Sequence, residues 1–192
     1  MVDRIEREGL EYQPYYCEEN VWRLLARPEL SGTINWAVIV SNSARDVVCL
    51  RQRSGRPVDG LVHWDYHVFA VVTDSLQGRL AIDMDSDLPF PSPLSRYLAA
   101  TFPPGEIQRA LAPRFRVMKG GDYVSLFVSD RSHMRRPDGS WIAPPPPWPA
   151  PGAGAGRPSL LADWTDINRR KPGDWYDSQQ MASFAVDSVK GY

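Results

Sequence analysis

The run Leu61–Thr73 (LVHWDYHVFAVVT) constrains the fold of this chain more than any other segment. It is rich in β-branched and aromatic residues, which favour strands over helices. Turn-forming residues follow at Asp74–Gly78, and Arg79–Asp85 (RLAIDMD) is again typical of a strand. The sequence therefore predicts two long antiparallel strands joined by a short turn.

Further strands and helices are expected on both sides of this pair. Cys17–Ala26 predicts a helix, because its apolar residues recur at helical spacing and Pro28 follows it. Ile34–Ser41 and Val47–Arg51 are expected to be strands joined by the polar turn Asn42–Asp46. The other expected elements are an extended segment, a helix, a strand, a short helix or turn and a last helix, at Leu88–Pro93, Leu94–Thr101, Phe115–Lys119, Asp122–Val128 and Gln179–Val189. The expected fold class is α/β or α+β, with a mostly antiparallel central sheet flanked by helices.

Length and charge limit the number of domains and the kinds of partner that the chain can have. Residues 1–192 are enough for one domain with a sizeable core and too few for two, so a single domain is expected. The 22 Lys and Arg nearly balance the 23 Asp and Glu. Nucleic acid and anionic membranes are therefore not expected partners, because both require concentrated positive charge.

The sequence also favours a particular compartment. No apolar run approaches the length of a membrane span, and the N-terminal residues carry charges where a signal peptide would be apolar. The two cysteines are too few for a disulfide framework, which favours free thiols in a reducing environment. A cytoplasmic location is expected, with the nucleus as a further one in a eukaryote.

Residues 135–159 are rich in proline and glycine and are expected to contain neither regular helix nor strand. The run Pro144–Pro147 could dock a domain that binds polyproline II helices. Trp141 and Trp148 flank the run and favour another interpretation. In that interpretation the segment packs against aromatic residues of its own domain.

Few residues can serve nucleophilic catalysis, because the chain has two cysteines and three histidines. Cys17 is expected in the first turn of its helix, where the unpaired backbone N–H groups and the helix dipole favour a thiolate. Glu18 and Glu19 oppose this effect, so a cationic histidine is needed nearby. A small buried residue is the other interpretation of Cys17, whereas Cys49 lies in an apolar strand and is expected in the core.

His63, Asp65 and His67 share one face of the expected strand, because side chains alternate along a strand. Such a face fits a solvent-exposed edge, and it also fits a catalytic base aimed into a cleft. Asp83 faces His67 if the hairpin centres on residue 75, which requires an odd-numbered loop. A four-residue loop would place Asp83 on the opposite face, and Asp65 and Asp85 are alternatives to it.

If these groups meet, their chemistry is that of a catalytic triad. Cys17 would be the nucleophile, His67 would take its proton, and Asp83 would orient the imidazole. The backbone N–H of Cys17 is one expected donor to an oxyanion. The sequence has no zinc-ligand spacing and no glycine-rich phosphate loop, so neither a metal nor a cofactor is expected.

Several motifs resemble the protein N-terminal glutamine amidohydrolases, also called the WDYHV family. They follow the family's order along most of the chain. The matching segments are Tyr16–Trp22, Trp64–Val68, Asp83–Asp85, Leu88–Pro91, Phe115–Val117, Ser129–Met134 and Pro144–Pro149. The resemblance implies a monomer whose α/β fold is similar to papain-like and transglutaminase-like cores.

The resemblance also implies an activity. The family's catalytic Cys, His and Asp fall on Cys17, His67 and Asp83. The implied reaction converts an N-terminal Gln of a protein or peptide to Glu, with release of ammonia, through a thioester. Internal Gln and N-terminal Asn are not expected substrates. In eukaryotes this deamidation feeds the N-degron pathway.

Selectivity for an N-terminal residue requires recognition of the free α-ammonium, for which Glu18, Asp65 and Asp85 are candidates. Ala143 and Trp148 replace an acidic residue and a tyrosine that the family tends to carry. Two other functions stay open. A cysteine acyltransferase or peptidase could use the same triad, and a non-catalytic adaptor could act through the proline-rich segment.

Overall fold

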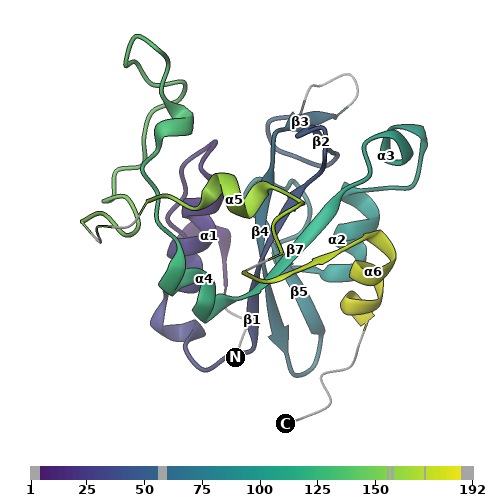
Figure 1. Ribbon diagram of the computed structural model, residues 1–192. Helices are drawn as coiled ribbons and strands as arrows, with labels where there is room; N and C mark the ends of the chain where they lie inside the picture. Colours follow the sequence, from purple (N-terminus) through teal and green to yellow (C-terminus); the bar gives the residue numbers. More distant parts are fainter. Residues whose placement is uncertain (1–4, 56–59, 155, 157, 171, 187–192) are drawn as a thin grey trace.

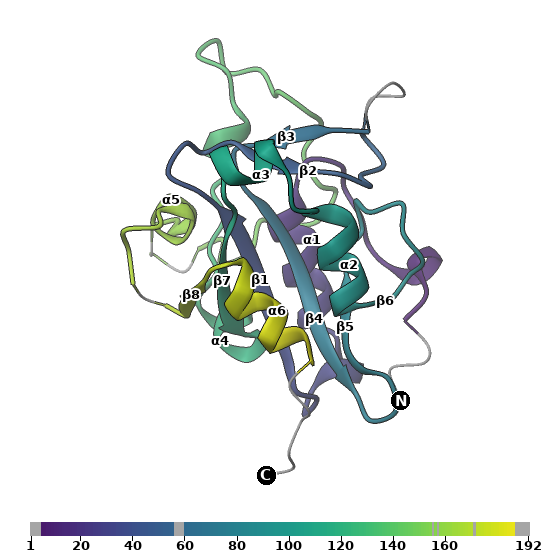
Figure 2. The same ribbon diagram turned by 90° about the vertical axis from the view of Figure 1, so that its right-hand side faces the viewer.

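The structure is a computed structural model that describes residues 5–55, 60–154, 156, 158–170 and 172–186. Its strands are β1 (Asn35–Ser41), β2 (Val47–Cys49), β3 (Val62–Trp64), β4 (His67–Asp74), β5 (Gly78–Ile82), β6 (Ser92–Pro93), β7 (Arg114–Lys119) and β8 (Asp174–Tyr176). Six of them form an antiparallel sheet in the order β6-β5-β4-β1-β7-β8, and β2 pairs with β3 in a small second sheet (Figures 1 and 2).

Helices cover both faces of the six-stranded sheet (Figure 1). The α-helices of the described residues are α1 (Cys17–Leu25), α2 (Leu94–Thr101), α3 (Glu106–Ala110), α4 (Gly120–Leu126), α5 (Leu161–Thr165) and α6 (Ser178–Val186). One face packs against α1, α4 and α5, and the other packs against α2 and α6. The expected fold class is confirmed, while the likeness to papain-like and transglutaminase-like cores stays a prediction. In the described part of the chain, no helix is long and apolar enough to cross a membrane.

Strand β4 explains why the sheet is covered on both sides. Val68, Ala70 and Val72 point into the core beneath α1, whereas Phe69 and Val71 point into the core beneath α2. All five are at most 1% exposed. Such a continuous apolar run is typical of a strand that is buried on both faces.

The segment Leu61–Thr73 is not one strand, and this expectation was wrong. Strand β3 ends at Trp64, and β4 begins at His67 in the other sheet. At the break, the Asp65 carboxylate accepts a hydrogen bond from the backbone N–H of Tyr66 at 3.1 Å. Such local bonds compete with the strand ladder. Consequently His63 and Asp65 do not share a face with His67.

The hairpin of β4 and β5 has the expected parity but a different centre. The pairs Ala70–Ile82 and Asp74–Gly78 centre it on residue 76 rather than residue 75, with a three-residue loop between the strands. Asp83 therefore lies just beyond the end of β5, two residues before Asp85, which this register would place directly opposite His67. Because the loop is odd-numbered, Asp83 still lies on the same face as His67.

The other expected elements differ mainly at their ends. The turn Asn42–Asp46 forms, and the Asn42 amide closes it by donating to the backbone oxygen of Asp46 at 2.7 Å. However, the strands on its two sides belong to different sheets. The described residues of 135–159 contain neither helix nor strand, as expected. Residues 56–59, and residues 187–189 of the last expected helix, lie outside the described residues.

Candidate active site

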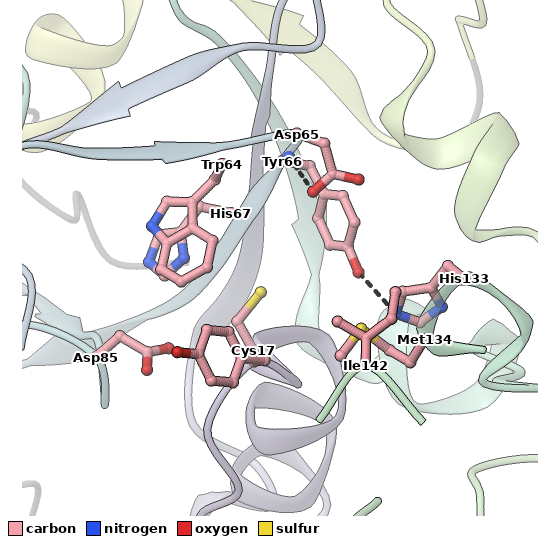
Figure 3. A pocket seen from close by; sticks show the side chains of 10 residues that line it. Cys17, Trp64, Asp65, Tyr66, His67, Asp85, His133, Met134 and Ile142 are labelled. Atoms are coloured by element: carbon pink, nitrogen blue, oxygen red, sulfur yellow. Dashed lines mark hydrogen bonds between the residues drawn. The ribbon is translucent and has the colours of Figure 1, made fainter. Parts of the chain in front are cut away.

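A cavity of about 220 Å³ lies where α1 begins, beside the first residue of β4 (Figure 3). Its lining residues are Tyr15, Cys17, Trp64, Asp65, Tyr66, His67, Asp85, His133, Met134 and Ile142. Titratable side chains therefore stand among apolar ones in a concave site, which is usual for substrate pockets. The cavity is the candidate active site.

Cys17 is the first residue of α1, and its sulfur points into the cavity (Figure 3). Burial raises the pKa of the thiol well above its ordinary value, and the carboxylates of Glu18 and Asp85 raise it further. A backbone hydrogen bond from Val68 lowers it. The expected position at a helix start is confirmed, but burial and the carboxylates outweigh the effect of the helix terminus on the thiol. A thiolate here therefore requires a partner that accepts the proton.

His67 lines the same cavity as Cys17 and forms a buried pair with Asp83. His67 Nε2 lies 3.0 Å from Asp83 Oδ2, and both side chains are 1% exposed. A carboxylate only accepts hydrogen bonds, so Nε2 carries the proton and Nδ1 is the remaining acceptor of the ring. Burial alone would lower the pKa of His67, but the Asp83 carboxylate outweighs it and raises that pKa. Burial likewise opposes ionisation of Asp83, yet His67 lowers the pKa of Asp83 overall.

Trp64 covers the imidazole from the cavity side. Its ring is stacked on that of His67, with 6.2 Å between centroids and 17° between planes (Figure 3). Tyr15 contacts Trp64 edge-on, with centroids 6.0 Å apart. The break between β3 and β4 makes this stacking possible, because Trp64 would otherwise point away from His67. The imidazole is therefore held between an aromatic ring and a carboxylate.

The opposite wall comes from residues 131–148, here called the strap. Its residues His133, Met134 and Ile142 line the cavity across from His67 (Figure 3). The strap is bound to the first turn of α1, because Arg131 makes two hydrogen bonds of 2.8 Å to the buried Glu19 carboxylate. These contacts fix one wall of the cavity to the helix that carries Cys17.

The strap makes further contacts with the same turn. Trp148 Nε1 donates to Glu19 Oε2 at 2.9 Å, and Tyr16 Oη donates to the backbone oxygen of Ala143 at 3.2 Å. Arg131 also donates to the backbone oxygen of Trp148 at 2.9 Å. The strap thus packs on its own domain, as the flanking tryptophans indicated.

Glu18 lies behind the cavity rather than in its lining. Its carboxylate is fully buried, and Oε2 accepts from the Cys17 thiol at 3.6 Å. Glu18 Oε1 lies 3.4 Å from His133 Nε2, and Tyr66 Oη lies 3.3 Å from that same nitrogen. Burial lowers the pKa of His133, but the Glu18 carboxylate raises it above its ordinary value. A second imidazole with cationic tendency therefore faces His67 across the sulfur.

Comparisons with known proteins identify the family. The sequence profile of the N-terminal glutamine amidases matches residues 12–185. The chain belongs to this family. It is 47% identical over 147 residues to the protein N-terminal glutamine amidohydrolase of Drosophila pseudoobscura pseudoobscura. It is 46% identical over 147 residues to those of Drosophila erecta and Drosophila melanogaster. Each match covers 72% of this chain and 70% of the relative.

N-terminal glutamine amidases are hydrolases that act on an amide bond. In this member, some of the predicted site residues line the cavity and others do not. Cys17, His67 and Asp85 line the cavity, and Asp83 stands behind His67. Asp85 is 8% exposed and accepts from Tyr12 Oη at 2.6 Å. Burial and the charge of Asp83 raise the pKa of Asp85.

The remaining predicted residues are more exposed. The Asp65 side chain lines the cavity but is 60% exposed and lies 3.8 Å from Arg45. His63 is half exposed and lies 2.7 Å from Asp46, outside the cavity of this amidase. Of the histidines, only His67 combines burial with a carboxylate partner. Among the described residues, no group of three or more His, Cys, Asp and Glu side chains is placed to hold a metal ion.

Sequence reasoning missed several residues around the amidase site. Gln52 and Tyr97 both bind the Asp83 carboxylate, and Arg131 binds Glu19. Gln52 lies in a charged loop and Tyr97 on an amphipathic helix. Polar residues are common in such segments, so the sequence does not single these two out. Arg131 had one signal, because it belongs to the motif Ser129–Met134 that resembles the family.

Proposed function

We propose that this protein hydrolyses the side-chain amide of an N-terminal glutamine, giving N-terminal glutamate and ammonia. Its substrates are then proteins or peptides that begin with Gln. The observation that carries the proposal is that His67, in a buried pair with Asp83, lines the same cavity as Cys17, in a chain of the N-terminal glutamine amidase family. The names of the relatives from Drosophila support the same activity.

In the first half of the proposed reaction, the Cys17 proton passes to His67 Nδ1 as the sulfur attacks the side-chain carbonyl carbon. The raised pKa of His67 favours this transfer. The raised pKa of the Cys17 thiol opposes its ionisation before the sulfur attacks. The carbonyl oxygen becomes an oxyanion, which the backbone N–H of Cys17 can bind. His67 then protonates the departing nitrogen, so ammonia leaves and a γ-glutamyl thioester remains.

In the second half, water attacks the thioester carbon. His67, now neutral, takes a proton from this water and returns it to the sulfur as the carbon–sulfur bond breaks. The products are N-terminal glutamate and the original thiol. Asp83 keeps its charge throughout and stabilises the imidazolium form of His67.

The acidic cavity supports selectivity for an N-terminal residue. Asp65 and Asp85 line it, and Glu18 stands directly behind Cys17. An α-ammonium bound among these carboxylates balances the charges that raise the pKa of the thiol. An internal glutamine has no ammonium at this distance from its amide. It therefore neither neutralises the carboxylates nor assists ionisation of Cys17.

Ammonia release from three matched peptides tests the proposal. They carry Gln first, Gln in second position, or Asn first, in an otherwise identical sequence. Release from the first peptide alone, with a mass increase of about one dalton in the product, is the expected result. Equal release from the internal Gln peptide would contradict it. So would formation of an isopeptide when a primary amine is added, because the protein would then be an acyltransferase.

A further inference from the structure

The Asp83 carboxylate binds more groups than His67. Its Oδ2 accepts from His67 Nε2 at 3.0 Å, from Tyr97 Oη at 2.9 Å and from Gln52 Nε2 at 3.1 Å. Its Oδ1 accepts from the backbone N–H of Asp85 at 2.9 Å. Gln52 is 4% exposed and Tyr97 is 1% exposed, so water does not compete for these bonds. Both carboxylate oxygens are therefore held by fixed donors.

The side-chain donors come from separate parts of the fold. Tyr97 belongs to α2, and its ring lies 4.8 Å from that of Phe69 on β4. Gln52 follows β2 and is bridged to Ser86, just after β5. The plane of the Asp83 carboxylate is consequently fixed by one donor from α2 and another from the segment after β2.

A contribution to stability does not explain why polar Gln52 and Tyr97 are buried at these positions. Gln52 Oε1 is buried and has no hydrogen-bond partner among the described residues. Tyr97 lies within the apolar core beneath α2. A buried oxygen without a partner costs free energy, and an apolar residue of the same volume avoids that cost. Their common feature is the bond that each gives to Asp83.

We propose that Gln52 and Tyr97 are positioning residues that hold the Asp83 carboxylate in the one orientation that keeps the proton of His67 on Nε2 and directs Nδ1 to Cys17. The inference rests on the proposed function, because it assumes that His67 serves Cys17. Neither residue touches the substrate. Each acts through Asp83, and Asp83 acts through the imidazole.

Removing either donor has a defined electrostatic effect. Both hydrogen bonds lower the pKa of Asp83, although burial opposes them. Without one of these bonds the carboxylate can turn away from His67, which weakens the hydrogen bond and the attraction that raise the pKa of His67, so that this pKa falls. The other titratable or charged groups that interact with Asp83 are Cys17 on α1, Cys49 on β2, Asp85 after β5, and Arg7 and Tyr12 in the N-terminal segment. None of these changes in the variants below.

The test uses Tyr97→Phe and Gln52→Met in the full chain, because both substitutions conserve volume. Matched controls are Tyr176→Phe and Gln108→Met. Gln108 donates to the backbone carbonyl of Val48 at 2.9 Å and, like Gln52, buries an unpartnered Oε1, but it lies away from the cavity. We expect kcat for the N-terminal Gln peptide to fall about tenfold or more in each Asp83-binding variant, with KM within about twofold. Both controls are expected to keep the wild-type kcat.

A second readout does not depend on the proposed substrate. The rate of Cys17 alkylation by iodoacetamide is followed against pH, with the modified peptide identified by mass spectrometry. In Tyr97→Phe and Gln52→Met the profile is expected to shift to higher pH, because less imidazolium is present to stabilise the thiolate.

The two readouts separate two kinds of failure. A wild-type protein that releases no ammonia from any Gln peptide would refute the proposed function, and the alkylation profiles would still decide the positioning proposal. Wild-type kcat and wild-type alkylation profiles in both variants would overturn the positioning proposal alone. Equal losses in the Gln108→Met control would overturn it as well.

Discussion

The wall of the cavity formed by the sheet and the wall formed by the strap hold their residues in different ways. On the sheet side, His67 is buried on β4, where it pairs with Val40 of β1, and Asp83 is buried directly after β5, which pairs with β4. On the strap side, the backbone is irregular, and the wall depends on side-chain contacts such as those between Arg131 and Glu19. The sheet wall is therefore positioned by backbone pairing, whereas the strap wall is positioned by side-chain contacts with the rest of the domain.

This difference separates chemistry from binding. Proton transfer tolerates little displacement, and the imidazole lies on a paired strand while its carboxylate directly follows the neighbouring one. The strap contributes His133, Met134 and Ile142, which contact whatever enters the cavity. A perturbed strap should therefore change KM before kcat, whereas a perturbed sheet wall should change kcat. The following predictions test this contrast.

Removal of the nucleophile between the two walls should have the largest effect. Cys17→Ala is expected to lower ammonia release from an N-terminal Gln peptide by about 10⁴-fold or more, because neither wall can replace the sulfur. The melting temperature, followed by circular dichroism, should stay close to that of the wild type. Activity above about 1% of wild type would exclude Cys17 as the nucleophile.

Disruption of the sheet wall comes next. Asp83→Asn keeps the shape of the side chain but removes the charge that stabilises the imidazolium, so kcat should fall by about 10²-fold to 10⁴-fold. KM should change little, because Asp83 does not line the cavity. Steady-state kinetics measure both parameters. A large rise in KM with unchanged kcat would show that the carboxylate serves binding rather than chemistry.

Disruption of the strap wall should have the opposite signature. Glu19→Gln removes the charge that binds Arg131 and is expected to raise KM by about tenfold, equivalent to about 1.4 kcal/mol. It should also destabilise the fold by about 3–5 kcal/mol in urea denaturation, because the largely buried Arg131 loses the opposite charge that balances it.

The matched control for the strap is Glu29→Gln, which breaks the exposed ion pair of Arg27 and Glu29. Its expected cost is below about 1 kcal/mol. An equal loss of stability in the two variants would mean that the Glu19–Arg131 contact does not anchor the strap.

The His67–Asp83 pair also predicts how stability depends on pH. The pKa of Asp83 is lowered by folding, so its contribution is lost as the pH falls through that pKa. The pKa of His67 is raised by folding, so its contribution is lost as the pH rises through that pKa. The wild type should exceed Asp83→Asn in free energy of unfolding mainly between these two values. A difference that is constant with pH in urea titrations would contradict this assignment.

A histidine outside both walls should have the smallest effect. His63 pairs with Asp46 on the surface, and exposed pairs contribute about 0–1 kcal/mol. His63→Ala is therefore expected to leave kcat and KM within about twofold of wild type, in the same assay. An inactive His63→Ala protein would move the assignment of the base away from His67.

Local patterns predicted the parts of the site that depend on local structure. The apolar spacing predicted helix α1 and the following proline predicted its end, and the odd loop places Asp83 on the face of His67. The break at Asp65 and Tyr66 could not be read, because the whole run has strong strand propensity. Strand propensity describes single residues, whereas a change of sheet depends on tertiary pairing.

The contacts between distant segments were beyond the sequence. Glu19 and Arg131 are 112 positions apart, and Gln52 and Asp83 are 31 apart. Each of these residues is polar, and polar residues are normally solvent-exposed, so neither burial nor partner can be derived from residue type. The candidate catalytic residues could be predicted because the chain has few cysteines and histidines. The residues that hold them in place could not be predicted.

The first turn of α1 has a further consequence. Consecutive residues of an α-helix point about 100° apart, so Cys17, Glu18 and Glu19 look in three directions from one turn. The first faces the cavity, the second lies behind it near His133, and the third binds the strap. Three outward contacts at such angles fix the rotation of the helix about its own axis. The aim of the sulfur is therefore set by two neighbours that need not take part in any bond-making step.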